Sequence, residues 1–104
     1  MVQYLGVLRG TGTLACGEEA FGAASYELDG FVNRPGEVIA SGELRMEAAA
    51  LNSAFGRRDL QLRTEDGRLL QIRFSAKRLA PTSNVAHIDA AGDLPPANKW
   101  KPKR

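Results

Sequence analysis

The sequence is poor in the residues that crosslink small domains or hold metal ions: its 104 residues include one cysteine and one histidine. A single cysteine excludes an internal disulfide, and the pair falls short of the four Cys/His ligands of a structural zinc site. No apolar run approaches the roughly 20 residues of a membrane-spanning helix. The segment Met1–Tyr4 lacks the basic and apolar regions of a signal peptide, so we expect a cytoplasmic protein.

Motifs of catalysis and nucleotide binding are also absent. The chain has neither a G-x-x-x-x-G-K-[ST] phosphate loop nor the G-x-S-x-G motif of serine hydrolases. Gly10-Thr11-Gly12 does not continue into G-x-G-x-x-G before a helix, and we interpret it as part of a bend over Gly10–Thr13. We therefore expect no catalytic residues, no cofactor and no metal.

Charge is concentrated at the C-terminus. The chain has 14 Lys and Arg against 12 Asp and Glu, and the last six residues, 99–104, hold four of the basic residues and no acidic one. Without them the rest of the chain is slightly acidic. The basic balance is therefore a property of the tail and is no argument for nucleic-acid binding by the folded body.

Composition and length predict one globular domain, since 43% of the residues are hydrophobic and 25% are charged. We expect a single β-rich domain over residues 1–90. Residues 91–104 contain the adjacent Pro95 and Pro96 and few apolar residues. Because such a segment has little to bury, we expect a flexible basic tail there.

The clearest local pattern is a hairpin between Asp59 and Phe74, where apolar and polar residues alternate on both sides of Glu65-Asp66-Gly67. The alternation predicts two half-buried strands. A three-residue turn with Gly67 in the left-handed conformation aligns their apolar faces, whereas a two-residue turn sets Leu62 against Gln71. The favoured register pairs Thr64 with Arg68, Leu62 with Leu70, Leu60 with Ile72, Gln61 with Gln71 and Asp59 with Arg73.

The remaining segments complete a mainly β prediction. A first strand starts near Val2, a second hairpin spans Tyr26–Met46 around Arg34-Pro35-Gly36, and a last strand covers Val85–Ala90. Gly30 and Gly42 interrupt the second hairpin and indicate bulges or sharp coiling.

One segment departs from the β pattern. Residues 47–55 are rich in helix formers, with Ala48, Leu51 and Phe55 on one stripe before Gly56, and predict a short helix that plugs a barrel end.

Six or seven short strands with one short helix predict a small antiparallel β-barrel or sandwich. Barrel closure would remove the exposed strand edges of so short a chain. An open sheet that forms a homodimer through an edge strand is the alternative.

Candidate binding residues fall into two basic groups. Arg63 and Arg73 share the outer face of the best hairpin, and Arg57-Arg58 precede it. Arginine recognises phosphate and carboxylate well. The simpler interpretation is a solvated face, since Asp59 opposes Arg73 and no aromatic residue is interleaved for base stacking. The second group is the tail, which would attract nucleic acid or an anionic surface: Lys99, Trp100, Lys101, Lys103 and Arg104.

The function is not readable from these features, and a non-enzymatic binding or regulatory β-domain is the first hypothesis. A nucleic-acid-associated protein that uses both basic groups is an alternative. Another is an enzyme that pairs Cys16 with His87, although Cys16 as a small apolar filler is the simpler interpretation. A further alternative is a small-ligand barrel with an apolar pocket bounded by Tyr26, Phe31, Phe55 and Phe74.

Overall fold

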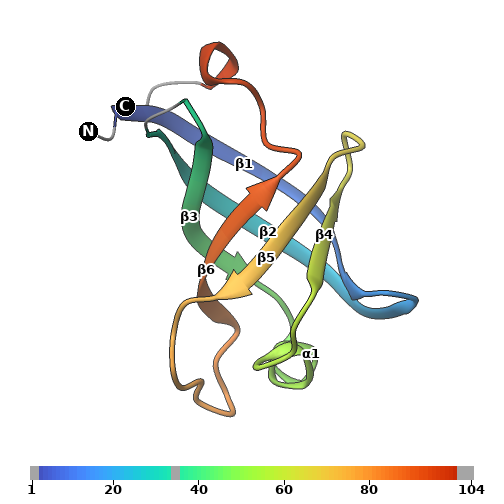
Figure 1. Ribbon diagram of the computed structural model, residues 1–104. Coiled ribbons are helices and arrows are strands. Elements are labelled where there is room, and N and C mark those ends of the chain that lie inside the picture. Colours follow the sequence, from blue (N-terminus) through green and yellow to red (C-terminus); the bar gives the residue numbers. More distant parts are fainter. Residues whose placement is uncertain (1–2, 34–35, 101–104) are drawn as a thin grey trace.

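The computed structural model describes residues 3–33 and 36–100. They form a closed antiparallel barrel with the strand order β1-β2-β3-β6-β5-β4, in which β4 returns to β1 (Figure 1). The mainly β prediction is thus confirmed, and the barrel is the form that it takes. The elements are β1 (Gln3–Cys16), β2 (Glu19–Val32), β3 (Val38–Arg45), α1 (Ala48–Ala54), β4 (Leu60–Thr64), β5 (Leu69–Phe74), β6 (Val85–Gly92) and the 3-10 helix η1 (Ala97–Lys99).

The β4–β5 hairpin has the predicted register. Leu60 pairs with Ile72, Gln61 with Gln71 and Leu62 with Leu70. The Thr64 amide donates to the Arg68 carbonyl at 2.9 Å, which closes the three-residue turn. Gly67 has φ 91°, a conformation that residues with a Cβ atom rarely adopt.

The outermost pair of this hairpin was predicted wrongly. Asp59 lies before β4 with φ 60°, and Arg73 is instead opposite Asp89 of β6. The Arg73 guanidinium lies 3.4 Å from the Asp89 carboxylate. The left-handed turn at Asp59 ends the pairing of β4 with β5 at Leu60 and Ile72, and the pairing of Arg73 with Asp89 lies on the other side of β5.

The bend expected at Gly10–Thr13 is also wrong, because these residues lie within the 14-residue strand β1. The chain turns later, at Gly17-Glu18, and Cys16 then pairs with Glu19. A Cβ atom at Gly12 would collide with the Arg63 carbonyl of β4. The glycine therefore serves the close approach of β1 and β4 that closes the barrel, a tertiary contact that local sequence does not reveal.

The second hairpin is confirmed as β2 and β3, with Val32 opposite Val38. Of its expected turn, residues 34 and 35 lie outside the described residues. Between β2 and β3 the pairing of Gly30 with Ala40 and of Gly42 with Leu28 is regular, whereas on its other side Gly30 pairs with Gly6 at a register shift of β1. The observed shifts lie between β1 and β2, at Tyr4/Gly6 and Leu14/Ala15.

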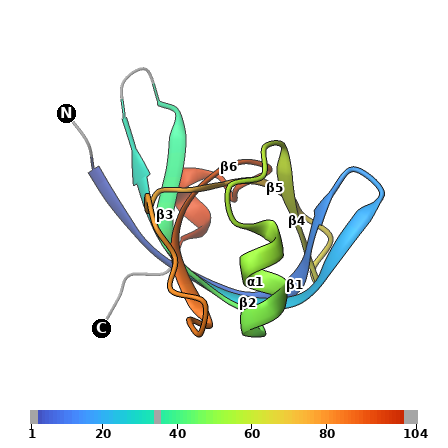
Figure 2. The same cartoon turned by 90° about the horizontal axis from the view of Figure 1, so that it is seen from below.

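The barrel interior is filled with leucine and isoleucine side chains. Its largest fully buried side chains are those of Leu14, Leu28, Leu44, Leu51, Leu60, Leu62, Leu70 and Ile88. The predicted helix is confirmed as α1, whose Leu51 and Ala54 are buried in this core. Viewed from below, α1 lies across one end of the barrel (Figure 2). The Glu47 carboxylate accepts a hydrogen bond from the Ala50 amide and so caps the helix.

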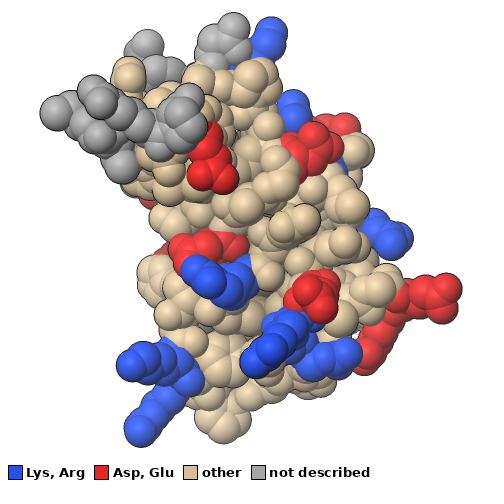
Figure 3. All heavy atoms as spheres, in the orientation of Figure 1, with Lys and Arg blue, Asp and Glu red and all other residues tan. Residues whose placement is uncertain are grey.

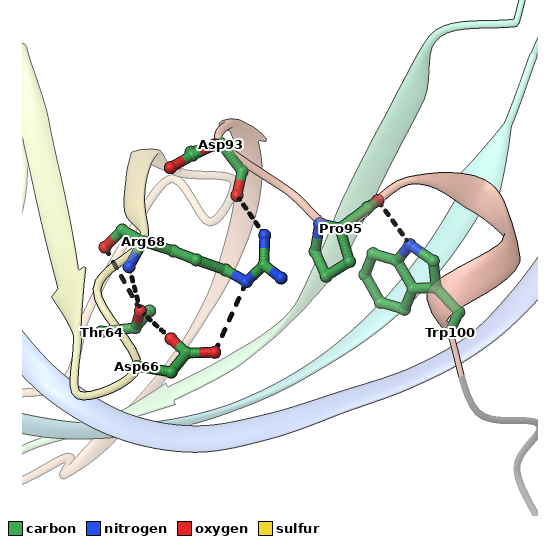
Figure 4. Close-up of polar contacts among 6 residues, drawn as sticks. All are labelled: Thr64, Asp66, Arg68, Asp93, Pro95 and Trp100. Carbon is green, nitrogen blue, oxygen red and sulfur yellow. Dashed lines mark hydrogen bonds and ion pairs between the residues drawn. The ribbon is translucent and has the colours of Figure 1, made fainter.

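The segment after β6 covers the other end of the barrel, although the sequence predicted a loose tail from residue 91. β6 runs to Gly92, Pro95 is buried, and Trp100 is only 8% exposed and belongs to the core. The Trp100 indole donates to the Pro95 carbonyl at 3.0 Å (Figure 4). The sequence interpretation relied on the charge and proline content of the segment. It did not consider the free energy gained when one indole ring is buried.

Barrel closure leaves one strand edge only partly paired. β1 pairs with β4 through Gly12–Cys16, while its first half pairs with β2 alone among the described strands. Among the described strands, Gln3–Gly10 therefore has no pairing partner on the side away from β2. Over the described residues, no helix has the length and apolar character needed to cross a membrane.

Candidate functional site

A groove of about 850 Å³ crosses the outer face of β3, β6, β5 and β4. Figure 2 shows the β2–β3 hairpin and the segment between α1 and β4 on opposite sides of β5 and β6. These two features form the ends of the groove. Its lining comprises Phe31, Ile39, Ala40, Ser41, Arg57, Arg58, Asp59, Leu60, Gln61, Gln71, Ile72, Arg73, Asp89, Ala90 and Ala91.

Strand register explains how these residues meet. In a β-strand every second side chain points outward, so residues paired across neighbouring strands form rows on the outer face. One row joins Ala91, Gln71 and Gln61, which pair across β6, β5 and β4. The parallel row joins Ser41, Asp89 and Arg73 across β3, β6 and β5. The two rows therefore bring charged and uncharged polar side chains into a groove whose lining is otherwise largely apolar.

One end of the groove carries two arginines. The Arg57 guanidinium pairs with Glu19 at 3.1 Å and lies 5.3 Å above the Phe21 ring. The hydrogen bond to Glu19 raises the pKa of Arg57 further above its ordinary value. The Arg58 side chain forms no hydrogen bond or ion pair with any described residue. Arg58 is therefore the groove cation whose guanidinium is available to a ligand.

The acidic residues of the groove limit its positive charge. Asp59 lies beside the two arginines in the lining, and Asp89 neutralises Arg73 on the floor. The Arg73 side chain is 84% exposed, so this ion pair contributes little to stability. Three arginines and two aspartates give a mildly positive groove, which suits a ligand with one or two negative groups better than a polyanion.

The opposite end of the groove is apolar. Ile39 is 36% exposed and pairs with Phe31, and the Phe31 ring meets the Tyr4 ring edge-on at 5.5 Å. The Tyr4 hydroxyl donates to Asp29 at 3.0 Å, which anchors that ring. Partial desolvation, followed by this hydrogen bond, raises the pKa of Tyr4. An exposed isoleucine beside two aromatic rings is a surface on which an apolar side chain can pack.

The structure brings together three of the four arginines singled out from the sequence. Arg57, Arg58 and Arg73 line the groove, whereas Arg63 is an exposed residue of β4 outside the lining. On the face drawn in Figure 3, basic side chains gather in the lower half, and several stand beside acidic ones. This face therefore carries no continuous basic surface.

The tail residues have separate outcomes. Lys99 is exposed at the end of η1, and Trp100 is buried against the barrel. Trp100 is therefore a core residue, which corrects its assignment to a binding tail. Lys101, Lys103 and Arg104 lie outside the described residues.

The Cys16 and His87 hypothesis gains no support from the topology. Cys16 lies on β1 between β2 and β4, whereas His87 lies on β6 between β3 and β5. The Cys16 thiol donates to the Arg58 carbonyl at 3.2 Å. Across residues 3–33 and 36–100, no group of three or more His, Cys, Asp or Glu side chains is arranged to hold a metal ion.

The four aromatic residues expected around an internal pocket do not share one. Phe31 lines the outer groove, while Phe55 and Phe74 pack on each other at 5.1 Å beside α1. Tyr26 lies on the interior, where burial, and then the nearby Asp66, raise its pKa. The small-ligand hypothesis in its original form, with one pocket inside the barrel, is therefore wrong.

A second polar cluster lies at the turn between β4 and β5. Arg68 contacts the Asp66 carboxylate at 3.4 Å and donates to the Asp93 carbonyl at 3.3 Å (Figure 4). Thr64 donates to Asp66 and accepts from the Arg68 amide. The bond from Thr64 lowers the pKa of Asp66. These groups are hydrogen-bonded to one another and connect the turn to the C-terminal segment. We therefore interpret the cluster as a structural one.

Comparison of the chain with models of protein families, with curated proteins and with solved structures finds no match. The groove must therefore be interpreted from its own residues. The sequence indicated the arginines of its cationic end. It named Phe31, although for an internal pocket, and it gave no signal for Ile39, whose place beside β6 depends on the pairing of β3 with β6.

Proposed function

We propose that the protein is a non-catalytic binding domain and that the groove over β3, β6, β5 and β4 is its ligand site. One observation carries the proposal: a groove of about 850 Å³ joins a cationic end, where the Arg58 guanidinium has no partner among the described residues, to an apolar end. Ligand sites generally have volumes of this order and combine apolar walls with a few polar groups. The ligand carries a negative group that pairs with Arg58.

Unpartnered amide groups on the floor support this proposal. Gln61 and Gln71 face each other across β4 and β5, and neither side chain is hydrogen-bonded to another described residue. Each amide offers both donors and an acceptor to a ligand. A charged end, a polar floor and an apolar end together fix how a ligand lies in the groove.

Nucleic acid is the less favoured ligand. The lining has two aspartates against three arginines, and Phe31 is its one aromatic residue. Binding to a nucleic-acid backbone rests on many cations, and single strands are held by several stacking rings. For the tail residues Lys101, Lys103 and Arg104, attraction to nucleic acid or an anionic surface stays a hypothesis from sequence.

An NMR titration of the full chain tests the site without assuming the ligand. Acetate, inorganic phosphate and a ten-residue oligothymidylate serve as anionic probes while the backbone amides are followed. We expect shifts at residues 57–59 and 71–73 with at least one probe. Arg58→Gln should abolish them, whereas Arg63→Gln, an exposed arginine of the same sheet outside the groove, should preserve them. If no probe shifts these amides, the groove is not an anion-binding site.

We also propose a cytoplasmic location and a homodimer through the first half of β1. The free thiol of Cys16 suits a reducing compartment, and Gln3–Gly10 offers the partly paired strand edge. Arg9 is the one charged residue of β1, and it pairs with Glu27 at 2.6 Å. The edge of β1 therefore carries no unpaired charge that would oppose the addition of another strand. Sedimentation velocity over a range of concentrations tests the dimer, and a monomer throughout would refute it.

A further inference from the structure

We infer that the ligand of the groove is an extended peptide segment with an acidic residue four positions from a large apolar residue. This inference rests on the proposed function, because it names the occupant of the same site. The acidic side chain pairs with Arg58, and the apolar side chain packs on Ile39 and Phe31.

The two ends of the groove set the spacing. The lining runs from Ile39 on β3, across β6 and β5, to Arg58 just before β4. Three steps between neighbouring strands of about 4.8 Å each give about 14 Å across the strands. Arg58 is also displaced along β4 from the row of Ile39, and its long side chain can reach back along this offset. An extended chain rises about 3.3 Å per residue, so about four residues bridge the ends.

An even spacing also gives the correct orientation. Side chains of an extended chain alternate between two faces, so residues four positions apart point to the same side. An extended segment lying across the strands can therefore turn both anchoring side chains into the groove. In a helix the same two residues would be about 6 Å apart and would not reach both ends.

The floor of the groove fits a peptide backbone. The amide groups of Gln61 and Gln71 lie between the two ends and are free to bond the N–H and C=O groups of a crossing chain. Ser41 adds a hydroxyl in the neighbouring row. A nucleotide strand would bring one phosphate per residue, and Asp59 and Asp89 would repel several of them.

The ion pairs of the lining arginines are consistent with one acidic anchor. Arg57 is held by Glu19, and Arg73 by Asp89, so two of the three lining arginines are already neutralised. A second acidic residue in the ligand would have to displace one of these partners. The structure therefore assigns one dominant ion pair between ligand and protein, at Arg58. Packing of an apolar side chain on Ile39 is the second interaction that selects the ligand.

Synthetic peptides test the inference with the full-length protein. The probe is a fluorescein-labelled octapeptide of Ser and Thr residues with one Glu and, four positions later, one Phe. Companion peptides move the Phe to two positions after the Glu, or replace Glu with Gln or Phe with Ala. Fluorescence anisotropy gives the dissociation constants, and an NMR titration shows where each peptide binds.

We expect the four-residue spacing to bind about fivefold or more tightly than the two-residue spacing, and the Glu-to-Gln peptide to lose about fivefold. The loss should vanish in Arg58→Gln and persist in Arg63→Gln, because Arg58 lines the groove and Arg63 does not. Ile39→Ser should likewise abolish the difference between the Phe and Ala peptides. Ile39 is partly exposed, so this variant is expected to fold.

The outcomes separate the two proposals. If peptides of both spacings bind equally, or if oligothymidylate shifts residues 57–59 and 71–73 while no peptide does, the peptide inference is overturned and the groove remains a ligand site. If neither peptide, oligothymidylate, acetate nor phosphate shifts these residues, both proposals fail.

Discussion

Replacement of Trp100 by alanine should be among the most damaging single substitutions in this chain. Trp100 is 8% exposed, belongs to the core cluster, and donates from its indole nitrogen to the Pro95 carbonyl. Truncation of a buried aromatic side chain costs about 3–5 kcal/mol, and loss of a hydrogen bond adds about 1 kcal/mol. We therefore expect Trp100→Ala to lower the free energy of unfolding by about 4 kcal/mol.

Urea unfolding followed by circular dichroism measures this loss. Lys99→Ala, an exposed neighbour in η1, is the matched control and should change stability by no more than about 0.5 kcal/mol. Trp100→Phe keeps an apolar ring but removes the indole donor. Its expected loss of about 1–2 kcal/mol leaves a folded protein in which the effect can be measured even if the alanine variant unfolds.

Gly30 provides an independent test of where the indole lies. A Cβ atom at this position would stand 2.7 Å from three carbons of the Trp100 ring. Gly30→Ala should therefore cost about 1–3 kcal/mol in the natural sequence. In combination with Trp100→Phe or Trp100→Ala the cost should shrink, because the smaller side chain leaves room for the methyl group. Strictly additive losses, or a Trp100→Ala loss below about 1 kcal/mol, would refute the docked C-terminal segment.

Four further predictions concern the groove, the turn, the closure of the barrel and the tail. Asp59→Asn removes a negative charge from the groove while keeping a residue that tolerates φ 60°, and should tighten anisotropy-measured binding of the acidic probe peptide about twofold to fivefold. The pKa of Asp66 is lower in the folded protein than in the unfolded chain, so its contribution is present above about pH 4 and is lost as pH falls through the folded pKa. Asp66→Asn should therefore reduce stability at pH 7 and flatten its decline in urea titrations below pH 4. Gly12→Ala should cost more than about 1 kcal/mol of unfolding free energy, because the new methyl group meets the Arg63 carbonyl of β4. The tail hypothesis predicts that low-salt binding to oligothymidylate disappears when Lys101, Lys103 and Arg104 are all replaced by glutamine; a natural chain that shows no such binding refutes it.

The choice of tail variant follows from the structure. A chain that ends at Ala97 would remove four positive charges together with Trp100, a core residue. Loss of binding in such a truncation would not distinguish a missing tail from an unfolded barrel. Replacement of the three terminal cations by glutamine leaves Trp100 in place.

The sequence predicted correctly those elements whose structure depends on interactions between residues close together in the chain. The β4–β5 register follows from matching apolar faces and from Gly67, and α1 follows from its helix-forming residues and apolar stripe. The sequence could not show that β4 returns to β1 or that β3 meets β6. Both pairings join segments far apart in the chain, and they determine barrel closure and the two rows of the groove floor.

For the candidate site too, the sequence predicted the parts that depend on local structure and missed those that depend on long-range strand pairing. Arg57, Arg58 and Arg73 flank or belong to one hairpin, so their proximity is a local property. Asp89 as the partner of Arg73, and Ile39 as the apolar end, both depend on the position of β6. The sequence prediction placed Trp100 in a tail because it used the average composition of the segment. The burial of one indole stabilises the folded segment more than its polar neighbours oppose it, and an average composition does not show this.

Intermolecular NOE measurements on the complex with the probe peptide show which residues of the protein the peptide contacts. With isotope-labelled protein and unlabelled peptide, we expect contacts between the Phe ring of the peptide and the Ile39 methyl groups, together with a shift of the Arg58 side-chain resonances. Contacts confined to the opposite side of the barrel, such as that around Arg9 and Glu27 on β1 and β2, would overturn the proposal, as would an Arg58 side chain that does not respond to the peptide.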